Sequence, residues 1–210
     1  MRLDLNERAP IYAWLATLFV REIDATTWEG LRSYPVRSIL TQLEPSLDAE
    51  LEHALLSERA AELDEEFTRL FLLPGGVSPL ASAWREESGE NRQPDKRPEE
   101  SIREGIAQLV GHGFEALGRE PVRAEPWGRL PLDHVSLLFD LVSCGATSST
   151  PSDLETAHHL DRELLGEWVG RFGRALSEQA DEPIYRSLGR LVYSMHGTTE
   201  SMLSPRTTEP

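Results

Sequence analysis

The sequence predicts an all-α fold, a helical bundle of two lobes joined by a hinge rich in proline and glycine. Apolar residues recur at helical spacing in one segment after another, whereas sustained alternation with a period of two is absent. A stretch from Gly118 to Pro131 with three prolines and two glycines, which disfavour helix, divides the chain. We therefore expect an N-terminal lobe over residues 1–118, a hinge over 119–131 and a C-terminal lobe over 132–210.

The N-terminal lobe contains three apolar stripes with helical periodicity. Asp24 precedes a short helix as its cap, and Gly118 ends the last helix of the lobe as a C-cap. The middle stripe predicts one longer helix with a break near Ser57, which stops at Pro74-Gly75-Gly76. The stripes cover residues 11–19, 51–71 and 102–114.

The C-terminal lobe shows the same periodicity and its own helix-start signals. Asp133 is placed to cap the helix that begins near His134. Ser152 and Glu155 have the spacing of a capping box before the long helix. The stripes cover residues 135–142, 160–176 and 184–195, and the second of these is the clearest in the chain. The charged segment 86–99 is expected to be a loop.

Charge is the unusual part of the composition: 21 basic and 36 acidic residues give a net charge of −15. Such a chain repels phosphate backbones, so nucleic acid is not expected as a partner, and it attracts basic segments. The alternative is that the excess charge only maintains solubility. The single cysteine, Cys144, excludes an internal disulfide and a cysteine-cluster metal site. No secretory signal or bilayer-spanning run is evident, so we expect a cytoplasmic protein.

Signatures of catalysis are mostly missing. Phosphate-binding glycine loops, a nucleophile elbow and histidine pairs with metal-ligand spacing are absent from the sequence, so no catalytic residue, metal or cofactor is expected. Asp133-His134 is the one step that resembles a general base with its orienting partner. Three interpretations stay open: helix capping with core packing, a site that accepts hydrogen bonds from a basic peptide, and a small hydrolase or transferase.

The segment from Phe71 to Trp84 keeps large apolar side chains around a glycine-containing break. In one interpretation it is a structural loop, and Trp84 fills a gap in the core. In the other, Leu72, Leu73, Leu80 and Trp84 present apolar surface that anchors a partner peptide. The sequence alone leaves both open.

Four segments in order resemble the TorD/DmsD family of redox enzyme maturation chaperones, most closely its TorD branch. The family's F/Y-x-x-L-F, P-Y-x-S-x-Y and E-P-x-D-H patterns correspond to residues 67–71, 79–84 and 130–134. Leu130 replaces the acidic residue of the last pattern, and Leu80 and Trp84 replace two tyrosines of the second. The remaining matches are residues 11–16, 18–19 and 21–24, with Trp168, Phe172, Tyr185 and Leu188 in the closing helices.

The resemblance implies a cytoplasmic chaperone that binds the twin-arginine signal peptide, the apo core, or both, of a molybdoenzyme precursor and aids insertion of its molybdenum cofactor before export. The implied client is trimethylamine N-oxide reductase, with a dimethyl sulfoxide or nitrate reductase type as the alternative. Some members bind guanine nucleotide; without a phosphate-binding motif we expect weak binding at most. The protein is expected to be a monomer or a domain-swapped homodimer. The implied client-binding residues are Phe71, Pro79, Leu80, Ser82, Trp84, Pro131, Asp133 and His134.

Overall fold

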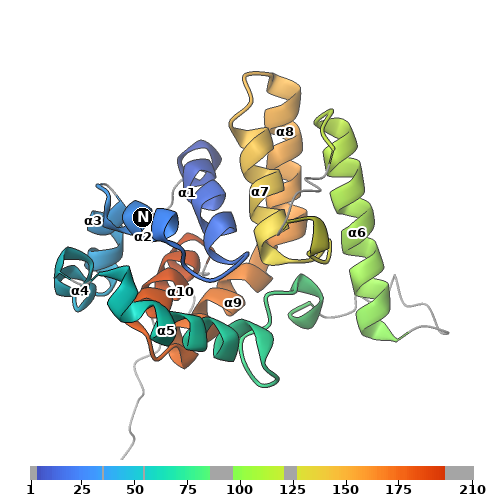
Figure 1. Ribbon diagram of the computed structural model, residues 1–210. Helices are drawn as coiled ribbons and strands as arrows, with labels where there is room; N and C mark the ends of the chain where they lie inside the picture. The colour runs from blue at the N-terminus through green and yellow to red at the C-terminus, as the bar shows by residue number, and fades with distance from the viewer. Residues whose placement is uncertain (1–3, 35, 54, 86–96, 121–126, 197–210) are drawn as a thin grey trace, which may run out of the picture.

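The computed structural model describes residues 4–34, 36–53, 55–85, 97–120 and 127–196, and within these ranges it is helical with no strand (Figure 1). The all-α prediction is therefore confirmed. Residues 121–126 of the expected hinge and 86–96 of the expected charged loop lie outside the described residues. The elements are α1 (Leu5–Leu18), α2 (Ala25–Arg32), α3 (Val36–Leu43), α4 (Leu47–His53), α5 (Leu56–Phe67), η1 (Thr68–Leu72), η2 (Ala81–Ala83), α6 (Pro98–Ala116), η4 (Trp127–Arg129), α7 (Val135–Ala146), α8 (Pro151–Leu160), η5 (Asp161–Leu165), α9 (Gly166–Gln179) and α10 (Pro183–His196).

The first helix packs against the second half of the chain. Figure 1 shows α1 beside α7, with α8 next to them and α6 at the edge of the group. The Tyr12 ring stacks on Phe139 with centroids 5.1 Å apart, and Ser143 donates a hydrogen bond to the Ala9 carbonyl at 2.8 Å. Helices on both sides of residues 119–131 thus contribute to one apolar core, and the division into two lobes stays a prediction.

Two of the expected helix boundaries are confirmed. Asp24 caps α2, and its carboxylate accepts the backbone N–H of Thr27. Gly118 follows α6 with φ of 59°, a left-handed conformation that glycine adopts without a Cβ clash. The Arg119 N–H then reaches back to the Phe114 carbonyl at 2.9 Å, which satisfies one of the free carbonyl groups at the end of the helix.

Other boundaries differ from the prediction. The N-cap of α8 is Thr150 and proline occupies the first helical turn, so Ser152 lies inside the helix and the capping box there is wrong. The break that was expected near Ser57 is confirmed, and it lies at Leu55, between α4 and α5. Helix α3 was not expected, because its eight residues carry only a short apolar stripe.

Two π-helical turns interrupt the helical pattern, η1 after α5 and η5 between α8 and α9. A π turn inserts an extra residue into a helix, which rotates the side chains that follow it, and such turns are frequent at functional sites. The π turn η1 ends at Leu72, directly before Leu73, and the π turn η5 begins at Asp161.

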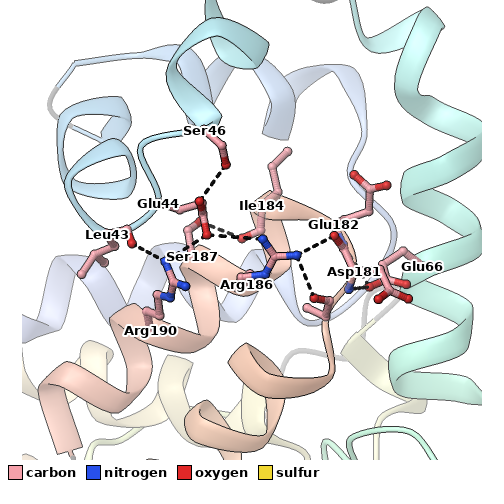
Figure 2. A network of polar contacts seen from close by, with 11 residues as sticks. Leu43, Glu44, Ser46, Glu66, Asp181, Glu182, Ile184, Arg186, Ser187 and Arg190 are labelled. Carbon is pink, nitrogen blue, oxygen red and sulfur yellow. Dashed lines mark hydrogen bonds and ion pairs between the residues drawn. The ribbon is translucent and has the colours of Figure 1, made fainter.

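The buried carboxylate of Glu66 links α5 to the start of α10 through hydrogen bonds. Glu66 accepts the backbone N–H groups of Asp181 and Glu182 at 2.7 and 3.3 Å (Figure 2). It also pairs with Arg69 through two hydrogen bonds of 2.7 and 2.8 Å. Burial opposes the charge of Glu66, yet these donors lower its pKa. Because free N–H groups gather at a helix start, the carboxylate acts as a cap supplied from another element.

A second carboxylate ties α10 to the segment between α3 and α4. Glu44 contacts Arg190 at 2.9 Å and Arg186 at 3.5 Å, and it accepts the Ser46 hydroxyl at 2.7 Å (Figure 2). The Ser46 hydrogen bond, followed by the two arginines, lowers the pKa of Glu44.

Helices α9 and α10 cross with their backbones in contact. A Cβ atom on Gly173 would lie 2.6 Å from the Tyr193 nitrogen, and one on Gly189 would lie 2.4 Å from the Ser177 nitrogen. Both positions therefore require glycine. None of the helices in the described ranges has the length and apolar character needed to cross a bilayer.

Candidate functional site

The two segments that the sequence analysis singled out lie against each other. Leu80 and His134 form an isolated antiparallel β-bridge. Its hydrogen bonds run from the Ala81 N–H to the Asp133 carbonyl at 2.9 Å and from the Val135 N–H to the Pro79 carbonyl at 2.8 Å. Backbone pairing across more than 50 positions of sequence thus joins the loop before α6 to the start of α7.

The Asp133 carboxylate is fully buried at this junction, with 0% of the residue exposed. Its Oδ2 atom accepts the Ser82 hydroxyl at 2.5 Å and the Ser82 N–H at 3.4 Å. Its Oδ1 atom accepts no hydrogen bond from the described residues. A buried carboxylate oxygen without a donor is costly, and such atoms call for a functional explanation.

One cation approaches this carboxylate within the described part of the chain. Arg103, on the exposed side of α6, places its Nε 3.7 Å from Asp133 Oδ2. No sequence pattern singles out this residue, since arginines on amphipathic helices are common. We call Ser82, Arg103, Asp133 and His134 the Asp133 site.

His134, and not Asp133, is the N-cap of α7, so the expectation that Asp133 caps this helix is wrong. The His134 Nδ1 atom accepts the Ser136 N–H at 3.2 Å. Burial lowers the pKa of His134 to about 4, against the pull of the neighbouring Asp133. The neutral ring with Nδ1 as acceptor carries its proton on Nε2. His134 therefore presents an N–H donor, whereas we had expected an acceptor, and this arrangement is unsuited to a general base.

Trp84 packs partly against the core and is partly exposed. Its indole N–H donates to the Ser78 carbonyl at 2.8 Å, and its ring packs edge-on against Phe172 with centroids 6.2 Å apart. Arg171 donates to the Trp84 carbonyl. The side chain is only half-buried, so one part of it closes the core and another faces outward.

Phe71 and the leucines that follow it are divided between core and surface. Phe71 is buried in contact with the rings of Phe19 and Tyr185, so the structure places it beneath the surface. Leu72 and Leu73 are 63% and 55% exposed. Gly76 allows this segment to double back, because a Cβ there would lie 2.3 Å from the Leu70 carbonyl oxygen.

The remaining expected site residues lie around the bridge with different exposures. Pro79 and Leu80 are half-buried and Pro131 is exposed. Leu132, directly before Asp133, is 40% exposed. The described residues contain no group of three or more potential metal ligands.

A second acid–histidine group, which is half-buried and which the sequence analysis did not identify, joins α1, η5 and the end of α10. Arg8 contacts both Asp161 oxygens, at 3.3 and 2.8 Å. The Tyr12 hydroxyl lies 2.9 Å from Asp161 Oδ1 and 2.8 Å from His196 Nε2. We call these four residues the Asp161 cluster. They lie far apart in the chain, so no local pattern could reveal them.

Comparisons with known proteins agree with the resemblance in the sequence. No protein-family model matches the chain, and no solved structure matches it. A Chaperone protein TorD of Psychrobacter sp. (strain PRwf-1) is 29% identical over 185 residues, which cover 79% of this chain and 76% of the relative. The proteins of the same name from Shewanella pealeana and Vibrio vulnificus (strain YJ016) are 26% and 25% identical over 198 and 210 residues. Each match covers 89% of this chain, with 85% and 90% of the respective relatives.

These relatives match most of an all-helical chain in which the two segments that carry the resemblance are paired through their backbones. Over most of its length the chain is similar to several curated proteins named Chaperone protein TorD.

Proposed function

We propose that this protein is a cytoplasmic chaperone that binds the precursor of a molybdenum reductase of the trimethylamine N-oxide reductase type. It recognises the twin-arginine signal peptide, the apo core, or both, and holds the precursor until its molybdenum cofactor is inserted. It has no turnover and no cofactor of its own, and it acts as a monomer or a domain-swapped dimer. The class of client follows from the family resemblance, and the structure supports the mode of recognition.

The observation that carries the proposal is the unpartnered Oδ1 atom of the buried Asp133 carboxylate. A guanidinium group is planar and offers parallel N–H donors that match the two oxygens of a carboxylate. Such a ligand would supply the donor that Oδ1 lacks. An arginine of the client is therefore the chemical group that this position fits best.

The surroundings of the carboxylate suit the rest of a signal peptide. The neutral His134 ring carries its proton on Nε2, and this N–H is a donor that a peptide carbonyl can accept. Leu132, directly before Asp133, offers exposed apolar surface to hydrophobic residues of the peptide, and Leu72 and Leu73 offer more such surface in the segment that leads to Ser82. The net charge of −15 attracts a basic segment at long range and raises its association rate.

Calorimetric titration with the twin-arginine peptides encoded in the same genome tests this proposal. We expect one of them to bind the wild-type protein, and we expect a version with both arginines changed to lysine to bind at least about tenfold more weakly, since lysine cannot form the bidentate contact. Absence of binding for every peptide and for the cofactor-free reductase would contradict the proposal.

A matched pair of variants locates the contact. Asp133→Asn removes the charge and keeps the shape of the side chain, and we expect it to weaken peptide binding by about tenfold or more. Asp140→Asn is the control, because it changes the same charge on the half-buried Asp140 of α7. Equal effects of the two variants would show that only the overall charge matters.

A further inference from the structure

Arg103 is the basic residue that already lies at the recognition carboxylate. Its side chain is 53% exposed, whereas the side chain of Asp133 that it contacts is 0% exposed. Helix α6, which carries Arg103, packs against η2, which carries Ser82. The Arg103 side chain thus extends from solvent to the buried carboxylate.

The distance between Arg103 and Asp133 is longer than the distances in other arginine–carboxylate pairs of this molecule. The contact is a single approach of Nε to Oδ2 at 3.7 Å, beyond hydrogen-bond distance. Elsewhere, Arg69 meets Glu66 through two hydrogen bonds of 2.7 and 2.8 Å, and Arg8 contacts Asp161 at 2.8 Å. The chain thus forms close arginine–carboxylate pairs at other positions and leaves the pair at Asp133 incomplete.

We propose that Arg103 occupies the place of the client's arginine in the free protein and leaves it when the client binds. This inference rests on the proposed function and adds a residue that sets its affinity. Arg103 partly neutralises the buried Asp133 charge while the site is empty, which lowers the cost of keeping that charge away from water. Because it makes no close hydrogen bond there, its displacement by a bidentate guanidinium costs little.

Competition between the two arginines predicts that removing Arg103 strengthens client binding. Because Arg103 is half exposed and makes no close hydrogen bond to Asp133, we expect it to compete only weakly, and we expect Arg103→Gln to tighten binding of the twin-arginine peptide by about two- to fivefold. Arg103→Lys keeps the competing charge and should bind as the wild type does. In the Asp133→Asn background, Arg103→Gln should no longer tighten binding.

Arg21→Gln is the matched control for overall charge. Arg21 is 52% exposed and pairs with Asp24 at the start of α2, so the variant removes one cation of the same exposure away from Asp133. We expect it to leave the affinity for the peptide unchanged. If Arg21→Gln tightens binding as much as Arg103→Gln, the effect is general electrostatics and the displacement of Arg103 is wrong.

The outcomes separate this inference from the function on which it rests. Wild-type binding with an unchanged or weaker affinity in Arg103→Gln overturns the inference and leaves the function intact. Failure of the wild type and all variants to bind any twin-arginine peptide or the cofactor-free reductase overturns both. Thermal unfolding of each variant checks that the fold is retained, and Arg103→Ala serves as a second variant if Arg103→Gln unfolds.

Discussion

The described residues contain two groups that combine an aspartate, a histidine and an arginine, and the groups differ in how completely the oxygens of their carboxylates are paired. In the Asp161 cluster both carboxylate oxygens have close partners, and the Tyr12 hydroxyl links Asp161 to His196. In the Asp133 site the Oδ1 atom has no hydrogen-bond partner among the described residues, and the Arg103 Nε atom lies 3.7 Å from Oδ2.

Under the proposed function, this difference separates a structural network from a recognition site. A carboxylate whose two oxygens are both paired stabilises one arrangement of the elements that it joins, here α1, η5 and the end of α10. Within this cluster the Arg8 Nε atom has no hydrogen-bond partner among the described residues. An incompletely paired group keeps hydrogen-bonding capacity for a ligand, at a cost in stability. Residue type alone does not distinguish the two, because each group contains the same three kinds of side chain.

The largest expected effect comes from Asp161. Asp161→Ala removes the partner of the mostly buried Arg8 and one partner of Tyr12, so we expect the free energy of unfolding to fall by about 2–4 kcal/mol. Chemical denaturation at pH 7 measures this loss. Twin-arginine peptide affinity should stay unchanged under conditions where the variant is folded.

Asp133→Asn tests whether the Asp133 site contributes less to stability than the Asp161 cluster. We expect it to change the free energy of unfolding by less than about 1 kcal/mol, since it keeps the shape of the side chain and the Asp133 site is incompletely paired to begin with. A loss of stability as large as that of Asp161→Ala would show that both groups are structural.

The second prediction concerns pH and His196. Burial lowers the pKa of His196 from 6.5 to about 4, with Asp161 opposing the shift and Arg8 adding to it. A lowered pKa means that the fold prefers the neutral ring, so its contribution to stability is complete above pH 6.5 and is lost as the pH falls towards 4. We expect the free energy of unfolding to fall by about 1–3 kcal/mol between pH 7 and pH 4.5 from this group.

His196→Gln should reduce that pH dependence, and the exposed His158 provides the control. His134 has a pKa lowered to the same value, so part of the pH dependence should remain in His196→Gln. Denaturant titrations of the wild type, His196→Gln and His158→Gln over this range measure the contribution. Identical slopes for all three proteins would contradict the assignment.

The smallest expected effect on stability concerns Leu72 and Leu73. Because both are more than half exposed, replacing both with serine should change the free energy of unfolding by less than about 1 kcal/mol. Peptide binding should weaken by about tenfold, because the apolar contact with the client is lost. Leu55→Ser is the control, since Leu55 is 56% exposed and precedes α5. Loss of binding with Leu55→Ser would make the effect unspecific.

The sequence predicted the helices well where their apolar stripes are long. The stripe that spans residues 160–176 became α9 together with η5, and the Pro74-Gly75-Gly76 break falls where the helix ends. It did not predict α3, whose stripe is short, or the π turns, because an inserted residue leaves an apolar stripe nearly unchanged.

The Asp133 site could be predicted only in part. The resemblance to the family singled out the two segments, but the bridge between Leu80 and His134 depends on pairing between residues far apart in sequence. The roles of Asp133 and His134 were exchanged at the helix cap, because histidine is an uncommon N-cap. Arg103 was missed since its importance arises only from its place beside Asp133.

The contact between α9 and α10 limits how this protein can respond to a client. Where Gly173 and Gly189 bring the two backbones together, no side chain can change rotamer to absorb a displacement. We therefore expect α9 and α10 to keep their relative orientation, and we expect a methyl group added at either glycine to push the two helix axes apart. Adjustment to clients of different shape must come from the helices that meet this pair through side chains.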